Sequence, residues 1–228
     1  MKKDVFIITR NVKTFYAVAE SLQKVEAGVP GMGLIFGDKG LGKTSVGIHY
    51  SCQKSNNAVY LRGKSDWTYG WMMEEILLEF GLTVRHGKKA KFDDLISALV
   101  EHPRLIVVDE TNMVAPDLLE TLRGVHDITH NPFLFIGHEG VRDLLMRLGP
   151  FYDRLLYKGE MTPLGLEDLE TYCSQALEVG IDRKSLEAVL EGAGGNFRRS
   201  VLHLKKLEDY AKLHKASAID QPMMKKVA

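Results

Sequence analysis

The segment from Gly37 to Thr44 constrains the fold of this chain more than any other part of the sequence. It reads Gly-Asp-Lys-Gly-Leu-Gly-Lys-Thr, a complete match to the pattern G-x-x-x-x-G-K-[ST], and it follows the short apolar run of residues 33–36. Glycines in this pattern let the backbone turn around an anion with successive N–H groups pointing inward, and the N-terminus of a following helix adds partial positive charge. We therefore expect a strand, a phosphate-binding loop and a helix in direct succession. The alternative, a glycine-rich turn that binds nothing, is disfavoured by the complete match in this context.

The pattern also assigns roles to the residues of the loop. Lys43 is expected to reach the β and γ phosphates of a nucleotide, and Thr44 is expected to hold Mg²⁺. The expected nucleotide ligands in and beside the loop are Gly37, Asp38, Lys39, Gly40, Leu41, Gly42, Lys43, Thr44 and Ser45. The sequence therefore predicts binding of a nucleoside triphosphate together with magnesium.

Helical patterns alternate with short apolar runs after the loop. The helical patterns cover residues 43–54, 67–80, 92–102, 116–126 and 141–148, and the apolar runs cover residues 58–61, 105–108 and 133–136. This alternation is typical of a parallel β-sheet flanked by helices. Continuous apolar runs such as residues 105–108 indicate central strands that are buried on both faces.

The pattern changes around residues 161–165, which read Met-Thr-Pro-Leu-Gly. Beyond them only helical patterns remain, over residues 166–179, 183–191 and 197–215. Proline and glycine mark the change as a hinge. We expect an α/β nucleotide-binding core of residues 1–162, including an N-terminal helical segment, followed by a small all-helical lid domain of residues 163–228.

Composition sets limits on partners and location. The 228 residues carry no net charge, so no overall field draws the protein to nucleic acid or to an anionic membrane, and such binding would need a local patch. The two cysteines, Cys52 and Cys173, are far apart in the sequence, which favours a reducing compartment. No apolar stretch reaches 18 residues, and the first apolar run is too short for a signal peptide. We expect a cytoplasmic protein that does not bind a membrane.

Two acidic residues, Asp109 and Glu110, follow the most apolar run in the chain. At the C-terminal edge of a parallel sheet they would lie beside the phosphate-binding loop. Phosphoryl transfer needs one carboxylate that holds Mg²⁺ through water and one that orients the attacking water. Asp109 is the candidate for the first role and Glu110 for the second. Capping of the following turn is the alternative.

Three further positions are candidates whose role the sequence leaves open. His138 follows the run of residues 133–136, so it is either a sensor of the γ-phosphate or a simple loop histidine. Arg198 lies in the first turn of the last long helix, where it opposes the helix dipole, and it would either clamp the phosphates or be solvated. Arg154 could act as an arginine finger on a neighbouring subunit, with Arg147 as a competitor and a surface ion pair as the alternative.

Taken in order, these motifs resemble those of AAA+ ATPases: Walker A, Walker B with Asp109-Glu110, sensor 1 at His138, an arginine finger at Arg154 and sensor 2 at Arg198. The resemblance covers essentially the whole chain. Within that superfamily the chain looks most like the transposition regulators related to phage Mu transposition protein B, TnsC and TniB, which share the Gly-Asn-x-Arg pattern of residues 195–198. Among the departures from the pattern of that group, Thr111-Asn112 stands where relatives often carry Ala-His, and His138 stands where Thr, Gln or Asn is usual.

This resemblance implies an activity and partners. It implies ATP and Mg²⁺ as cofactors, ATP hydrolysis, and a homo-oligomeric ring or helical filament on double-stranded DNA with ATP at the subunit interfaces. It also implies delivery of target DNA to a transposase, in a bacterial or phage-infected host cell. DNA contacts are expected to involve the backbone with little sequence preference.

The densest basic run provides the candidate DNA contacts: Arg85, Lys88, Lys89 and Lys91. We expect this run to form a loop that follows the phosphates, with a solvated surface turn as the alternative. Arg62 and Lys64 are weaker candidates, and the lysines of the last helix are expected to form only its solvated face.

Three other functions remain open at the level of the sequence. One is a nucleotide-gated scaffold with slow turnover. Another is a AAA+ ATPase similar to the secretion-associated ExeA, which would act on protein partners without a DNA role. A small-molecule kinase is the most distant, because nothing in the sequence resembles an acceptor pocket.

Overall fold

The computed structural model describes residues 1–2, 5–26 and 28–227. The chain forms two compact units, each with its own apolar core. The sheet unit comprises Thr14–Gly37 and Lys43–Glu160, and the helical unit comprises Met1–Lys13, Asp38–Gly42 and Met161–Ala228. The middle of the phosphate-binding loop therefore groups with the helical unit. The division into domains of residues 1–162 and 163–228 stays a prediction.

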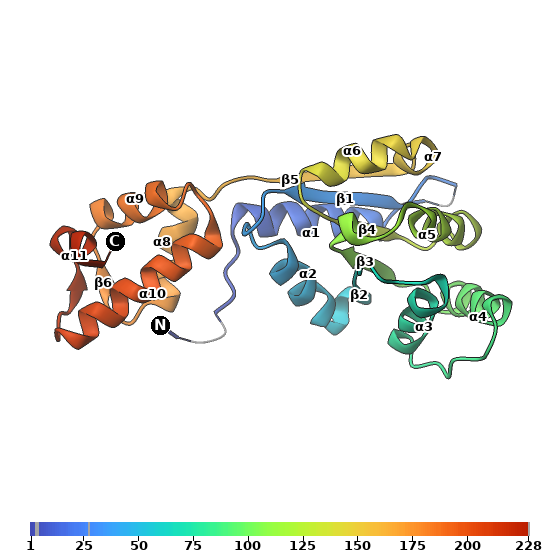
Figure 1. Ribbon diagram of the computed structural model, residues 1–228, viewed down its shortest axis with the longest axis horizontal. Helices are drawn as coiled ribbons and strands as arrows, with labels where there is room; N and C mark the ends of the chain where they lie inside the picture. The colour runs from blue at the N-terminus through green and yellow to red at the C-terminus, as the bar shows by residue number, and fades with distance from the viewer. Residues whose placement is uncertain (3–4, 27, 228) are drawn as a thin grey trace. The chain divides into compact units, whose positions relative to one another are not determined.

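A five-stranded sheet in the order β2-β3-β4-β1-β5 forms the centre of the sheet unit (Figure 1). Strands β1 to β4 pair in parallel, with Ile35 opposite Ile136 and Val108 opposite Phe135. The C-terminal ends of β1, β3 and β4 consequently lie along one edge of the sheet. The bounds of the strands are β1 (Met32–Gly37), β2 (Ala58–Arg62), β3 (Leu105–Asp109), β4 (Phe133–Ile136) and β5 (Leu155–Met161).

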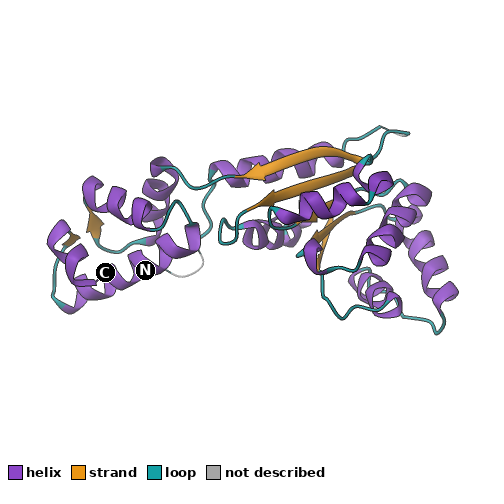
Figure 2. Ribbon diagram, turned by 45° about the horizontal axis from the view of Figure 1, so that its top comes forward, coloured by secondary structure: helices purple, strands orange, loops and turns teal. Residues whose placement is uncertain are grey.

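Helices cover both faces of this sheet (Figure 2). They are α1 (Arg10–Leu22), α2 (Lys43–Cys52), α3 (Tyr69–Glu79), α4 (Lys88–Glu101), α5 (Pro116–Thr129), α6 (Gly140–Arg147) and α7 (Gly149–Tyr152), with short 3₁₀ turns η1 (Lys54–Asn56) and η2 (Thr111–Met113). The packing of α1 on β1 is close, because a Cβ at Gly33 would lie 2.7 Å from Leu22 Cδ1. Every residue of β1, β3 and β4 is buried, as expected for central strands covered by helices on both sides.

The remaining elements belong to the helical unit. They are α8 (Leu166–Ala176), α9 (Arg183–Gly192), α10 (Phe197–Leu213) and α11 (Gln221–Val227), with the two-residue strands β6 (Gly180–Ile181) and β7 (Ala218–Ile219). Leu169, Leu186 and Leu204 are buried in its core, and Ile7 from the N-terminal segment joins them. Capping residues start two of these helices: Asp182 accepts from Ser185 N before α9, and Asn196 accepts from Arg199 N before α10.

The predicted fold class, a parallel α/β core with a helical C-terminal part, is confirmed. Two details differ from the expectation. The C-terminal part is mainly helical but not entirely so, because β6 and β7 pair in parallel. Strand β5 was not expected, since its residues are mostly exposed and form no apolar run. None of the helices in the described part of the chain combines the length and apolar character that a bilayer crossing requires.

Candidate nucleotide-binding site

The phosphate-binding loop connects β1 to α2, as the sequence predicts. Gly40 and Gly42 have φ values of +84° and +96°, a region that favours glycine because it has no Cβ. Helix α2 begins at Lys43, so its N-terminus follows the loop directly. The ammonium group of Lys43 donates a 2.7 Å hydrogen bond to the carbonyl of Gly37, the first residue of the motif. The loop thus has the backbone conformation and the helix start that an anion site requires.

Asp109 ends β3 at the same edge of the sheet. It is only 2% exposed, and each of its carboxylate oxygens accepts a hydrogen bond. Oδ2 accepts from the hydroxyl of Tyr60 at 2.7 Å, and Oδ1 accepts from the backbone N–H of Glu110 at 2.8 Å. Burial and the hydrogen bond to Asp109 raise the pKa of Tyr60, so its phenol remains a donor over the physiological range. Sequence reasoning missed Tyr60, because only the pairing of β2 with β3 brings it beside Asp109.

Glu110 has an unusual backbone conformation. Its φ of +51° lies in the left-handed region, where a residue with a Cβ is strained by on the order of 1 kcal/mol. The loop after β2 packs against this turn: Gly63 donates a 2.8 Å hydrogen bond to Asp109 O, and a Cβ on Gly63 would lie 2.6 Å from Val114 Cγ2. The surrounding structure therefore fixes Glu110 in a conformation that the residue does not favour by itself.

His138 follows β4 at this edge, between the strands that carry the loop and Asp109. Its Nδ1 accepts from Gly140 N at 3.1 Å, so in the neutral ring the proton lies on Nε2. Its backbone N–H donates to Asn112 Oδ1 at 3.4 Å. The two positions that depart from the pattern of the resembling proteins are therefore in contact with each other. The role of His138 as a sensor stays a prediction.

The structure also brings the start of α10 to the loop, inside the helical unit. Asn196 Nδ2 donates to Lys39 O at 2.7 Å, and the backbone N–H of Arg198 donates to Gly40 O at 3.1 Å. The side chain of Arg198 is exposed. The backbone of the predicted sensor 2 residue thus contacts the phosphate-binding loop, and Asn196 is a second contact that sequence reasoning missed.

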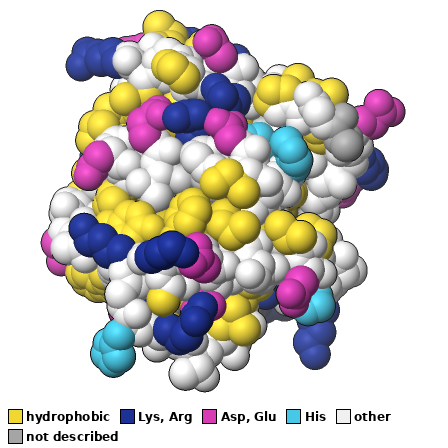
Figure 3. All heavy atoms as spheres, turned by 90° about the vertical axis from the view of Figure 1, so that its right-hand side faces the viewer, with side chains coloured by type: hydrophobic (Ala, Val, Ile, Leu, Met, Phe, Trp, Pro, Cys, Tyr) yellow, Lys and Arg dark blue, Asp and Glu magenta, His cyan; other side chains and the backbone are white. Residues whose placement is uncertain are grey.

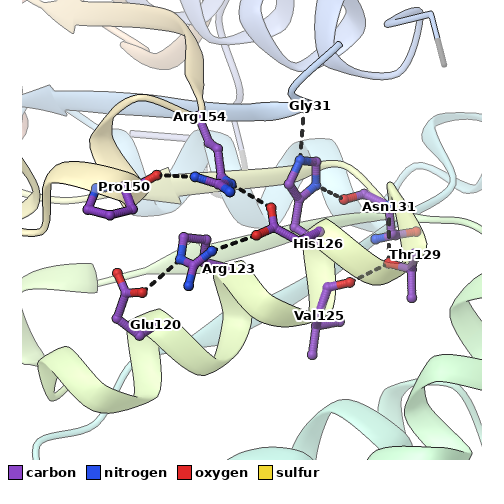
Figure 4. A network of polar contacts seen from close by, with 10 residues as sticks. Gly31, Glu120, Arg123, Val125, His126, Thr129, Asn131, Pro150 and Arg154 are labelled. Carbon is purple, nitrogen blue, oxygen red and sulfur yellow. Dashed lines mark hydrogen bonds and ion pairs between the residues drawn. The ribbon is translucent and has the colours of Figure 1, made fainter. Parts of the chain in front are cut away.

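Arg154 lies at the other end of the strands, near the residue that precedes β1 and away from the phosphate-binding loop (Figure 4). Its Nε donates to Asp127 at 2.5 Å and its Nη1 donates to Pro150 O at 2.6 Å. Asp127 also binds Arg123 at 2.5 Å, so the two arginines share one carboxylate. The competing candidate, Arg147, is exposed at the end of α6 and forms no ion pair within the described residues. Which arginine serves as a finger stays a prediction.

The expected basic loop is wrong in its structure, because α4 already begins at Lys88. Three of the four basic residues are paired with acids. Arg85 binds Asp94 through Nε at 2.8 Å and through Nη2, Lys89 binds Asp93 at 2.7 Å, and Lys91 binds Glu74 at 2.9 Å. Lys88 lies 5.8 Å from the ring centre of Tyr69. Viewed from the side of the molecule that carries α4, basic side chains alternate with acidic ones rather than forming one patch (Figure 3). The weaker candidate Lys64 is also paired, with Glu75.

A family model described as AAA domain matches residues 27–145, slightly more than half of the chain. The chain belongs to this family of P-loop nucleoside triphosphatases, in the AAA+ class.

Among curated proteins, none matches this sequence. Several solved structures share the fold. The ORC2 protein of Aeropyrum pernix superposes with a TM-score of 0.74 at 16% identity, over 99% of this chain and 70% of that one. Cdc6p of Pyrobaculum aerophilum superposes with a TM-score of 0.72 at 15% identity, over 96% of this chain and 66% of that one. RuvB of Thermotoga maritima superposes with a TM-score of 0.66 at 20% identity, over 98% of this chain and 70% of that one. The chain thus spans about two thirds of the length of these proteins.

Proposed function

We propose that this protein is an ATP-dependent DNA-binding ATPase that assembles on duplex DNA and regulates transposition by delivering target DNA to a transposase. The observation that carries the nucleotide part is the set of residues at one edge of the sheet: Lys43 and Thr44 at the start of α2, with Asp109 and Glu110 at the end of β3. The DNA part is supported by a fold shared with the Aeropyrum pernix ORC1 protein, whose structure is described as a complex with DNA. The role in transposition is supported by the sequence resemblance.

The residues present fit a magnesium nucleotide. Mg²⁺ prefers oxygen ligands, and the hydroxyl of Thr44 and the carboxylate of Asp109 are of that kind. Magnesium would neutralise charge on the phosphates. Asp109 is oriented by Tyr60 and by the N–H of Glu110, and each carboxylate oxygen keeps a lone pair for a water molecule. Lys43 would exchange its bond to Gly37 for the phosphates, and Glu110 would orient the attacking water.

Binding of DNA tests this proposal most directly. Wild-type protein is expected to bind a duplex of random sequence with ATP and not with ADP, as measured by fluorescence anisotropy. Lys43→Ala should abolish this binding. Lys184→Ala, which removes a solvent-exposed lysine of α9, is the matched control and should bind as wild type does. Equal binding by Lys43→Ala, or no binding by wild type with ATP, would contradict the proposal.

Glu110→Gln separates an ATPase that cycles from a scaffold with slow turnover. If hydrolysis drives cycling, this variant binds nucleotide and DNA but stalls there and does not pass the DNA to the transposase. If the nucleotide-bound filament is itself the active form, the variant is locked in that state and remains active. Electron microscopy with duplex DNA and either ATP or ADP should show filaments or rings only with ATP.

One observation favours a second function, an ATPase that acts on protein partners. Three of the four basic residues at positions 85–91 are paired with neighbouring acids, so this surface offers little attraction to DNA phosphates. A quadruple variant that neutralises Arg85, Lys88, Lys89 and Lys91 tests whether this surface contacts DNA. Loss of DNA binding in this variant favours the DNA function, and binding that persists unchanged removes residues 85–91 from the DNA interface. Absence of DNA binding in the wild type, with ATPase activity retained, favours the protein-partner function.

A further inference from the structure

The side chain of Asn196 makes two hydrogen bonds, one as an acceptor and one as a donor. Its Oδ1 accepts from Arg199 N at 3.1 Å, which caps α10, and its Nδ2 donates to Lys39 O at 2.7 Å. The backbone N–H of Arg198, also in the first turn of α10, donates to Gly40 O at 3.1 Å. The first N–H groups of a helix have no partner inside the helix. One of them therefore binds the cap, and another binds the phosphate-binding loop.

The contact between Asn196 and the loop is tight. A Cβ at Gly40 would lie 2.5 Å from Asn196 Oδ1 and 2.7 Å from its Nδ2. The φ of Gly40, +84°, also excludes most other residues. Gly40 is therefore required in part because the amide group of Asn196 occupies the space beside it.

The start of α10 is itself held in place. Gly195 has a φ of +67°, and its carbonyl accepts a 2.8 Å hydrogen bond from Leu164 N. A Cβ on Gly195 would lie 2.6 Å from Pro163 Cβ, so the turn before Asn196 packs directly on the segment before α8. Asn196 consequently approaches the loop from a fixed position.

These contacts determine which way two peptide groups of the loop face. In a planar trans peptide the carbonyl and the N–H point in opposite directions. The carbonyls of Lys39 and Gly40 are turned toward α10, so the N–H groups of Gly40 and Leu41 are turned away from it. Backbone N–H groups of such a loop are the groups that bind phosphate. The orientation of α10 therefore affects the groups that would hold the nucleotide.

We infer that Asn196 is a positioning residue for nucleotide binding: its side-chain amide fixes the peptide between Lys39 and Gly40, so that the loop N–H groups are aligned for phosphate. This role rests on the proposed nucleotide-binding function. It is separate from any contact of the Arg198 side chain, because it acts through the backbone of the loop. The cap of α10 and the contact with the loop use different atoms of the same amide, so substitutions can separate them.

Two substitutions keep the cap and remove the amide donor. Asp and Ser are both good N-cap residues, so Asn196→Asp and Asn196→Ser retain an acceptor for Arg199 N. An ionised Asp has no donor, and the hydroxyl of Ser lies one bond closer to the backbone than the Nδ2 atom that donates to Lys39 O. Loss of one hydrogen bond should weaken binding of a fluorescent ATP analogue by about threefold to tenfold. The same factor is expected in KM, with kcat unchanged, because an interaction that binds ground state and transition state equally is lost.

Asp182→Asn is the matched control, because Asp182 caps α9 in the same unit with a 2.9 Å hydrogen bond from Ser185 N. It should leave nucleotide binding unchanged. The melting temperatures of both Asn196 variants without nucleotide should stay within the range of this control.

Three results would overturn the inference. Binding as in wild type by both Asn196 variants would show that the contact with Lys39 does not matter. Weak binding by Asn196→Asp alone would assign the effect to the added charge. Weak binding that follows a loss of melting temperature would assign it to the cap. A wild-type protein that binds no nucleotide would instead contradict the proposed function, which keeps the two failures distinct.

Discussion

The hydroxyl of Tyr60 in β2 donates a 2.7 Å hydrogen bond to the carboxylate of Asp109 at the end of β3. The register of the two parallel strands sets up this pair, with Tyr60 opposite Val107 and Arg62 opposite Asp109. Substitution of a residue that orients a metal ligand typically costs about 10-fold to 100-fold in metal affinity or activity.

Tyr60→Phe should therefore slow ATP hydrolysis by on the order of tenfold and raise the Mg²⁺ concentration needed for half-maximal rate. The ring is retained, so its packing beside Gly47 is unchanged. The measurement is the hydrolysis rate across a magnesium titration. Tyr157→Phe, at a more exposed tyrosine of β5, is the control and should behave as wild type does. A wild-type magnesium response in Tyr60→Phe would show that the hydroxyl does not orient Asp109 for the metal.

Gly63→Ala should destabilise the protein by about 1–3 kcal/mol, because the new Cβ meets Val114 and the carbonyl of Glu110. Gly124→Ala in α5 is the matched control, since nothing lies within 4 Å of its added Cβ. Alanine there should stabilise the helix by up to about 1 kcal/mol. Urea denaturation measures both effects. Equal stability of the two variants would mean that the turn after β3 yields easily to the loop after β2.

Arg154→Ala should slow hydrolysis in the assembled protein by about 10³-fold or more while leaving nucleotide binding intact. A mixture of Arg154→Ala and Glu110→Gln subunits tests whether the arginine acts on a neighbour. One type of interface in the mixture combines an intact Glu110 with an intact Arg154, so activity should rise above that of either variant alone. Arg147→Ala is the control. No recovery in the mixture, with assembly intact, would place Arg154 in a purely structural ion pair with Asp127.

The thiol of Cys173 predicts a pH dependence of stability. Burial raises its pKa to about 12 from an ordinary value of 9.0. The neutral thiol is favoured in the folded state, so its contribution is fully present below pH 9 and is lost as the pH rises toward 12. The free energy of unfolding should therefore fall less steeply between pH 8 and pH 10.5 in Cys173→Ala than in the wild type. Parallel curves for the two proteins would show that Cys173 titrates normally.

The sequence predicted the parts of the fold whose signal is local. Strands β1, β3 and β4 are continuous apolar runs, and the phosphate-binding loop is a spaced motif, so each could be recognised from neighbouring residues. Strand β5 could not, because only Leu155, Gly159 and Met161 of its seven residues are buried, and its identity comes from pairing at the sheet edge.

The same limit applies to the candidate site. Asp109 and Glu110 could be placed because they directly follow a strand. Tyr60 and Asn196 could not, because their partners are distant in the sequence. Tyr60 lies 49 residues from Asp109, and Asn196 lies 157 residues from Lys39. The loop structure expected for the basic run at Arg85 was wrong for a related reason. Its charge is visible in the sequence, whereas Asp94 reaches Arg85 only because α4 begins at Lys88, and Glu74 reaches Lys91 only because α3 and α4 pack together.

The left-handed backbone of Glu110 means that the residue best suited to folding differs at this position from the residue that the proposed hydrolysis requires. Glycine would adopt the same φ without strain. Selection for thermal stability alone would therefore tend to replace the residue on which the proposed chemistry depends, and it would do so without disturbing the sheet. Under the proposed function, only a requirement for nucleotide turnover would keep the glutamate in place.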